Sequence, residues 1–431
     1  MRRNISRERQ LEAALDRLRS DRDSVVREMG EVRTGATIEA TADAFCRAVT
    51  RIADLDVARV LLVESEEQVV PLGVKGPVYL DWEIGVPIES DLLPLMLDRT
   101  RDGPWWVPLT ELLAAEGGRS RLIRPMLDAG FVSAGFAPVL RAGRLVAFLV
   151  VASRTRDDAR WSEARTTVLE ELGSFAGQVL GDQANHRSER RQRRDRIRAV
   201  IDGGRFHPVY QPVVDLATGE VAGYEALTRF DDGRRPDVVF GDAHEVGLGV
   251  ELETACASAA ARGSTALPAG TWLAVNLSPV SLIAGAASEL VMPAGRPVVV
   301  EITEHVEVES YAAVRAAVRA RPGMRLSVDD AGAGFASLRH ILELRPDFVK
   351  LDIALVRHID TDPARQALAA GLRHFAHQTG TILIAEGVET PTERDVLRHL
   401  RIPFAQGYLF GHPQPVPPGD GPEPAGPVAD G

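Results

Sequence analysis

The chain has 431 residues, which is enough for two or three domains. It is 45% hydrophobic and 26% charged, a composition typical of a folded globular protein. Its net charge of −11 argues against general binding to the phosphate backbone of nucleic acids. The longest apolar run, residues 145–152, is too short to span a bilayer, and no apolar signal core follows Met1. We therefore expect a cytoplasmic protein without a membrane span.

The amino-terminal third begins with charged, helical segments. Residues 1–34 carry apolar side chains at three-, four- and seven-residue spacing, which predicts either a short coiled coil or a helix packed on the protein. A helix is predicted over residues 37–52, followed by an apolar strand over residues 58–63. Cys46 falls in this helix, and with only Cys256 besides, the chain has too few cysteines for a disulfide framework or a zinc site.

A hairpin and a further helix complete this region. Strands are predicted over residues 136–140 and 145–151, with Ala142 and Gly143 supplying the turn. A helix follows from residue 161 to about residue 180. The order of elements in residues 35–183 resembles a GAF sensory domain. The resemblance implies a smaller α+β domain that receives an unknown small-molecule or protein signal.

The next segment, residues 184–203, is rich in arginine and is predicted to be a solvated connecting helix rather than a nucleic-acid patch. At the other end of the chain, residues 414–431 are rich in proline and glycine. Such a segment cannot bury enough apolar surface to fold, so we expect it to be disordered.

Residues 204–413 contain eight short apolar segments, most of them separated by helical stretches. This number and alternation predict a (β/α)8 barrel. The first two segments are joined by the short turn 217–220, so one strand is predicted to run antiparallel. The segments span residues 208–216, 221–230, 272–279, 297–305, 325–331, 347–355, 382–389 and 404–410.

Near their carboxyl ends the later segments alternate apolar and polar residues, as in Val299-Val300-Glu301-Ile302-Thr303. Period-two alternation sends the valine, isoleucine and leucine side chains outward to the helices and the polar ones inward. Active sites of such barrels lie at these strand ends. So many carboxylates in one place require cations, and oxygen ligands suit Mg²⁺ or Mn²⁺. The residues predicted to gather there are Glu225, Asn276, Glu301, Asp329, Asp330, Lys350, Asp352, Glu386 and Gln406.

Residues 205–413 contain a series of short motifs around the run Tyr224-Glu225-Ala226-Leu227-Thr228-Arg229-Phe230. Tyr210-Gln211-Pro212 precedes this run, and after it come Asn276-Leu277-Ser278-Pro279, Glu301-Ile302-Thr303-Glu304, Asp329-Asp330, Lys350-Leu351-Asp352, Ala385-Glu386-Gly387-Val388-Glu389-Thr390 and Gln406-Gly407-Tyr408. In content and order these motifs resemble the EAL domain family of cyclic di-GMP phosphodiesterases, which is named after Glu225-Ala226-Leu227.

The resemblance implies a role for each matching residue. Two ions, Mg²⁺ or Mn²⁺, would be held by Glu225, Asn276, Glu301, Asp329, Asp330 and Glu386. The catalytic residues would be Glu225, Lys350, Glu386 and Gln406, with Lys350 contacting the attacking water. Cyclic di-GMP would be bound by Gln211, Leu227, Arg229 and Asp352. Structural support would come from Glu304, which anchors the loop after Asp330, and from Glu389.

The leading hypothesis is an enzyme that hydrolyses the second messenger cyclic di-GMP to linear pGpG, regulated by the GAF-like domain. The loop after Asp330 departs from the family pattern at Ala331, Ala333, Phe335 and Ala336, although the implied metal ligands are intact. A catalytically inactive cyclic di-GMP receptor is therefore kept as the alternative. The two helical connectors favour a homodimer.

Overall fold

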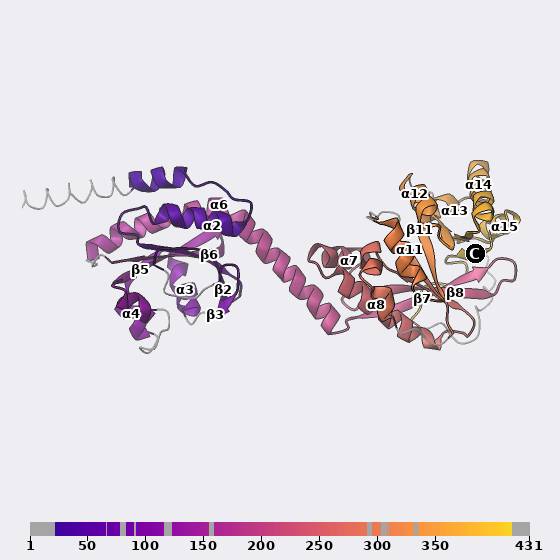
Figure 1. The fold of residues 1–431 in the computed structure, drawn as a ribbon, viewed down its shortest axis with the longest axis horizontal. Coiled ribbons are helices and arrows are strands. Elements are labelled where there is room, and N and C mark those ends of the chain that lie inside the picture. The colour runs from indigo at the N-terminus through magenta and orange to yellow at the C-terminus, as the bar shows by residue number, and fades with distance from the viewer. Residues whose placement is uncertain are drawn as a thin grey trace, which may run out of the picture. The chain divides into compact units, whose positions relative to one another are not determined.

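The structure is a computed structural model. It describes residues 22–65, 67–77, 83–89, 92–115, 123–154, 159–290, 295–302, 308, 310–331 and 335–415. The chain divides into two compact units, Met1–Arg191 and Gln192–Gly431 (Figure 1). No helix in the described part of the chain is both long enough and apolar enough to cross a membrane. Of the helix predicted over residues 1–34, the first 21 residues lie outside the described part, and residues 22–30 are helical.

The first unit is built on an antiparallel sheet in the order β3-β2-β1-β6-β5-β4. Its strands are β1 (Val57–Val63), β2 (Gln68–Lys75), β3 (Ile88–Glu89), β4 (Trp105–Pro108), β5 (Ser133–Arg141) and β6 (Arg144–Ser153). The predicted hairpin is present. Ala142 and Gly143 both have positive φ angles, 48° and 77°, as a two-residue turn between twisted strands requires.

Helices cover both faces of this sheet. One face packs on α2 (Ile38–Val49) and on the first part of α6 (Ala159–Asp202), and these elements share one apolar core. The other face packs on α3 (Leu93–Arg99), α4 (Leu109–Ala115) and α5 (Ile123–Asp128). Figure 1 shows α2 and α6 on one side of the sheet and α3 and α4 on the other. The unit is thus an antiparallel α+β domain, as predicted.

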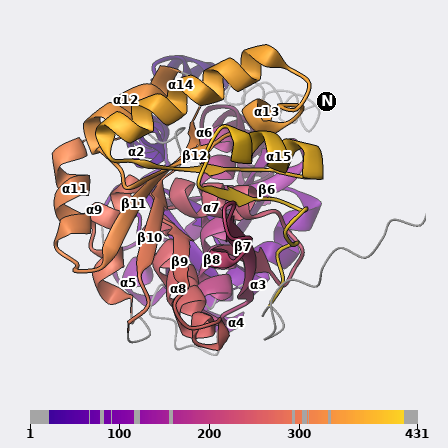
Figure 2. The same cartoon turned by 90° about the vertical axis from the view of Figure 1, so that its right-hand side faces the viewer.

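The second unit is a closed eight-stranded barrel (Figure 2). Its strands are β7 (Phe206–Asp215), β8 (Val221–Phe230), β9 (Trp272–Asn276), β10 (Val298–Ile302), β11 (Met324–Ala331), β12 (Phe348–Leu351), β13 (Ile382–Ala385) and β14 (Phe404–Gln406). β7 runs antiparallel to both neighbours, β8 and β14, and all other pairs are parallel. The predicted barrel with one antiparallel strand is confirmed.

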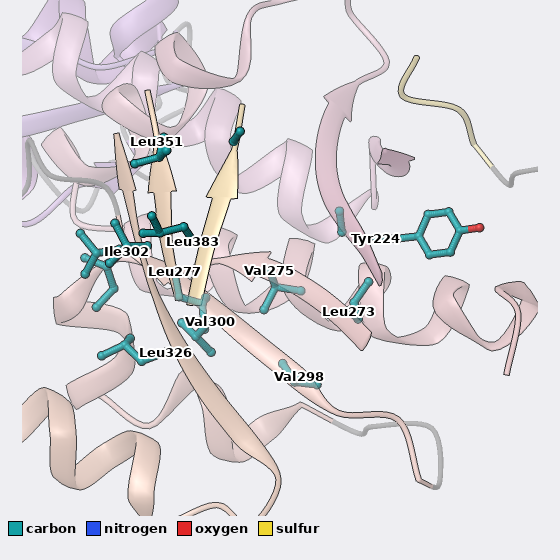
Figure 3. Close-up of a cluster of buried hydrophobic side chains, with 14 of the residues drawn as sticks. Tyr224, Leu273, Val275, Leu277, Val298, Val300, Ile302, Leu326, Leu351 and Leu383 are labelled. Atoms are coloured by element: carbon teal, nitrogen blue, oxygen red, sulfur yellow. The ribbon is translucent and has the colours of Figure 1, made fainter. Parts of the chain in front are cut away.

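Helices pack around the outside of the barrel. Their bounds are α7 (Pro236–Glu245), α8 (Gly249–Gly263), α9 (Pro279–Ile283), α10 (Ala286–Glu289), α11 (Tyr311–Arg319), α12 (Phe335–Leu344), α13 (Ile353–Val356), α14 (Pro363–Thr379) and α15 (Pro391–His399). On β10, Val298, Val300 and Ile302 belong to the apolar core beneath these helices (Figure 3). The alternate residues, Val299 and Glu301, therefore face the barrel interior. The predicted alternation is present.

The interior of the barrel is apolar below its polar layer. Trp272 and Phe348 lie there with ring centroids 5.7 Å apart, in a cluster that also includes Val299 and Ile384. Gly223 makes room for the indole, since a Cβ at this position would lie 2.1 Å from the ring of Trp272. This packed apolar layer fixes the strands whose ends carry the polar residues.

Three boundaries differ from the predictions. The helix expected to stop near residue 180 continues as α6 through the predicted linker to Asp202. Several parallel strands end before the predicted segments do, because the last residues of those segments leave the sheet and enter loops or helices. The tail predicted to be disordered from residue 414 begins with a paired residue. Gln414 exchanges two backbone hydrogen bonds with Tyr210, at 2.6 and 3.0 Å, while residues 416–431 lie outside the described part.

Candidate active site at the carboxyl ends of the barrel strands

Polar side chains from neighbouring strands meet inside the barrel at the carboxyl ends of the parallel strands. They are Glu225 on β8, Asn276 on β9, Glu301 on β10, Asp329 on β11, Lys350 on β12, Glu386 just after β13 and Gln406 on β14. Strand register places Glu301 beside Asn276 on β9, while Asp329 follows Ser327, the partner of Glu301 on β11, by two residues. Because inward positions alternate with outward ones, residues two apart on a strand still point into the same barrel interior.

Lys350 lies at the centre of this group and is 1% exposed. Its Nζ atom lies within ion-pair distance of four carboxylates: 2.7 Å from Glu386 Oε1, 2.9 Å from Glu301 Oε2, 3.2 Å from Glu225 Oε2 and 3.4 Å from Asp329 Oδ1. Four acidic side chains thus share one ammonium group.

Glu225 is also held by two amides. Asn276 Nδ2 donates to Glu225 Oε1 at 3.1 Å, and Gln406 Nε2 donates to Glu225 Oε2 at 2.7 Å. Gln406 Nε2 also donates to Gln211 Oε1 at 2.9 Å, and Gln211 Nε2 donates to the carbonyl of Gly411 at 3.1 Å. This chain of hydrogen bonds fixes the Glu225 carboxylate from the side of the antiparallel strand.

Four acidic side chains face one ammonium group in this site. Burial and these neighbouring charges shift the pKa values of Lys350, Glu386, Glu301 and Glu225. Burial alone would lower the pKa of Lys350, but the four carboxylates raise it well above its usual value. Burial raises the pKa of Glu386 to about 8 despite the attraction of Lys350, with Asp329 and Glu225 adding to the rise, and burial also raises the pKa of Glu301 well above the usual range. The pKa of Glu225 is lowered, because Lys350, Gln406 and Asn276 together outweigh its burial.

A β-bulge lies beside the site on β11. The register with β12 shifts between Val328 and Ala331, so β11 has one residue more than its partner at Asp329 and Asp330. Bulges of this kind interrupt strict alternation and are frequent next to active sites. The backbone of Asp330 belongs to β11, but its side chain lies outside the described part.

Lys350 and the polar side chains gathered around it form the Lys350 cluster, whose other members are Glu225, Asn276, Glu301, Asp329, Glu386 and Gln406. The other predicted site residues lie outside this cluster or outside the described part of the chain. Leu227 and Arg229 lie further along β8, where Arg229 Nη1 donates to the carbonyl of Thr228 at 2.9 Å. Asp352 caps α13 by accepting from Ala354 N at 2.7 Å. Glu389 pairs with Arg357 on the surface. Glu304 lies outside the described residues.

The sequence patterns did not single out Ser327 as a residue of the site. Ser327 is fully buried on β11, in register with Glu301 on β10 and Phe348 on β12. Among the described residues its Oγ has no hydrogen-bond partner. The signal for it was present, because Ser327 shares the inward parity of Asp329.

The donor set fits hard divalent cations. The gathered ligands are carboxylate and amide oxygens, which Mg²⁺ and Mn²⁺ prefer, and four carboxylates face a single ammonium group. Within the described residues, no three acidic, histidine or cysteine side chains are arranged to hold a metal ion as they stand. In this structure the carboxylates converge on Lys350 instead.

The sequence matches the family described as EAL domain over residues 193–413, just over half of the chain. The chain belongs to the EAL domain family. The match covers all eight strands of the barrel and every member of the Lys350 cluster.

Individual relatives cover the same region. The probable cyclic di-GMP phosphodiesterase PdeG of Escherichia coli (strain K12) is 27% identical over 242 residues, which is 50% of this chain and 46% of that protein. An uncharacterized protein of Mycobacterium tuberculosis (strain ATCC 25618 / H37Rv) is 29% identical over 237 residues, 51% of this chain and 38% of that protein. The matches thus span less than half the length of these two relatives.

Among solved structures, the chain is similar to Klebsiella pneumoniae BlrP1, solved as a calcium and cyclic di-GMP complex at pH 8.0. The two are 30% identical, with a TM-score of 0.44, and the match covers 49% of this chain and 56% of that one.

Proposed function

We propose that the barrel hydrolyses cyclic di-GMP to linear pGpG at the Lys350 cluster. The observation that carries the proposal is the convergence of four carboxylates, from β8, β10, β11 and the end of β13, on one buried ammonium group at the carboxyl ends of the strands. The EAL family includes cyclic di-GMP phosphodiesterases, and their use of divalent metals agrees with the oxygen ligands present here.

Two Mg²⁺ or Mn²⁺ ions would be held by the residues predicted from the sequence: Glu225, Asn276, Glu301, Asp329, Asp330 and Glu386. When bound, such ions activate a water molecule and stabilise the charge that develops on the departing 3′ oxygen. Ions held by these residues would add positive charge to a cluster in which one ammonium group faces four acidic side chains.

The protein's own groups then have distinct tasks. Lys350, which lies within 2.7–3.4 Å of all four acidic side chains, would donate a hydrogen bond toward the attacking water and the phosphate. Gln406 and Asn276 fix the Glu225 carboxylate, so it need not reorganise during the reaction. Gln211 anchors Gln406 and would line the dinucleotide site together with Leu227, Asp352 and Arg229, whose guanidinium suits a phosphate.

We also propose that residues 35–183 form a GAF-like sensory domain and residues 204–413 the phosphodiesterase barrel, with a homodimer as the active form. The continuous helix α6 supports regulation. Its last part belongs to the barrel unit, where Ile197 and Val200 are buried against α7 and α8. A signal that shifts or rotates α6 would reach these helices directly.

The deciding experiment incubates the purified full chain with cyclic di-GMP and Mn²⁺ or Mg²⁺ and follows pGpG by chromatography. Activity should vanish with chelator and be poor with Ca²⁺, which prefers longer bonds and more ligands. Glu225→Gln should lower kcat at least about a hundredfold. The exposed Glu220→Gln, on the turn before β8, is the matched control. A wild type that binds cyclic di-GMP without turnover would identify an inactive receptor instead.

A further inference from the structure

A second buried carboxylate network lies beside the site, on the outer side of β9. Glu253 on α8 is 7% exposed. Its Oε2 accepts a hydrogen bond from the backbone N–H of Ser278 at 2.8 Å, and its Oε1 lies 2.6 Å from His244 Nε2. Burial alone would raise the pKa of Glu253, but His244 and the hydroxyl and backbone donors of Ser281 and Ser278 lower it. Glu253 is thus a charged group with several donors aimed at it.

The segment that Glu253 holds is the one that carries Asn276. Asn276 ends β9 and donates to Glu225, and Ser278 follows it by two residues as the N-cap of α9. Between them, Leu277 N donates to the carbonyl of Glu301 at 3.1 Å. The backbone after Asn276 is therefore tied at two points, one on the neighbouring strand and one on the Glu253 carboxylate.

His244 connects this network to α7. Its ring lies against Gly249 at the start of α8, where an added Cβ would meet Nδ1 at 2.2 Å. Other charged groups near this end of α7 have partners of their own. Arg193 of α6 pairs with Asp242 at 3.3 Å and with Glu245, and Arg194 donates to the carbonyl of Val246 at 2.7 Å. Glu253 is the group whose charge acts on His244.

We propose that Glu253 is a positioning residue for Asn276, and that His244 holds Glu253 in place. The inference rests on the proposed function in one respect, because it takes Asn276 as a metal ligand. Partners that orient a metal ligand contribute about 10–100-fold to metal affinity, since a ligand that must be ordered on binding binds more weakly. Here the ordering acts through the backbone: the carboxylate holds Ser278, and Ser278 fixes the path of the chain that leaves Asn276.

Calorimetric titration of the full chain with MnCl₂, without substrate, tests this directly. Glu253→Gln removes the charge at nearly constant volume and should weaken Mn²⁺ binding about tenfold. His244→Gln should weaken it less, and only at a pH low enough for the imidazole to be protonated, such as pH 6 rather than pH 8.5. Gly249→Ala, which displaces the ring while keeping both partners, should resemble His244→Gln. The control is Glu251→Gln. Glu251 lies two residues before Glu253 on α8 and its carboxylate pairs with Arg198 of α6, so this variant should match wild type.

The outcomes separate the two ideas. Mn²⁺ affinity that is unchanged in Glu253→Gln, with or without a lower unfolding temperature, would overturn the positioning role. If Glu253→Gln does not fold, a Mn²⁺ affinity at pH 6 that is unchanged in both His244→Gln and Gly249→Ala would also overturn the positioning role. If the variants show the expected order of Mn²⁺ affinities but the wild type does not hydrolyse cyclic di-GMP, the positioning role is supported and the proposed activity is refuted. A wild type that binds no Mn²⁺ would refute both.

Discussion

Replacing Lys350 by methionine removes the ammonium group and keeps the length of the side chain. Four carboxylates then face one another without a cation inside the barrel. Removing one partner of a buried charge pair typically costs about 3–5 kcal/mol, because the remaining charge is left uncompensated. For a domain of 150–250 residues, about 1 kcal/mol lowers the unfolding temperature by 2–4 °C. Without metal, we expect Lys350→Met to lower the unfolding temperature of the barrel by roughly 6–20 °C.

Calorimetric scans of the full chain with and without Mn²⁺ test this expectation. Lys75 is the only other lysine in the chain and provides a matched control, because it lies on the surface 3.1 Å from Asp43. Such exposed pairs contribute at most about 1 kcal/mol, so Lys75→Met should change little. A metal concentration of 100 times Kd stabilises the folded state by about 2.7 kcal/mol, so Mn²⁺ should recover much of the loss in Lys350→Met. Equal unfolding temperatures for the two variants in chelator would refute this account of the cluster.

Three further outcomes follow from the packing. Gly223→Ala should destabilise the barrel by about 1–3 kcal/mol in urea titrations, because its Cβ overlaps the ring of Trp272; a neutral effect would contradict that packing. The contact with a carboxylate raises the pKa of His244 above 6.5, so its contribution to stability is present below pH 6.5 and lost as pH rises through the raised pKa. His244→Gln should therefore be less stable than wild type at pH 5.5 and equal at pH 8.5, and a gap independent of pH would contradict this. A chain starting at Gln192 should keep a stable barrel, whereas one starting at Gly204 should lose roughly 3 kcal/mol or more with the buried side chains of α6; equal denaturation midpoints would contradict this.

The barrel could be predicted because its sequence obeys one simple rule over many strands. Outward positions such as Val300 are apolar because they meet helices, and inward positions such as Glu301 are polar only near the carboxyl end. The same rule does not mark where a strand ends. Asp352 continues the alternation after Leu351, yet its side chain caps α13 and the chain has already left the sheet. Hydrogen bonding to the neighbouring strand decides that boundary, and this information is not local in sequence.

Only part of the candidate site could be predicted from the sequence. Strand-end parity selected the residues around Lys350 but not Ser327, and it could not show that Lys350 lies between four acids rather than beside them. Nor could it select Glu253, which lies on a helix in no motif and reaches the site through the backbone of Ser278. Contacts of this kind depend on how α8 packs against β9. The residue pattern within one strand or one helix contains no information about that packing.

The arrangement around Lys350 also gives a physical reason for a lysine at this position in a chain whose basic residues, apart from Lys75, are all arginine. An ammonium is a compact charge with three donors, so it can lie between 2.7 and 3.4 Å from oxygens of four different acidic side chains. A planar guanidinium presents its donors in one plane and suits one or two carboxylates side by side. Lys350→Arg would need more room than a fully buried position allows, and it would direct its donors to fewer of the four acids. One charge near four carboxylates still leaves them short of positive charge, and divalent cations at the same strand ends would supply it.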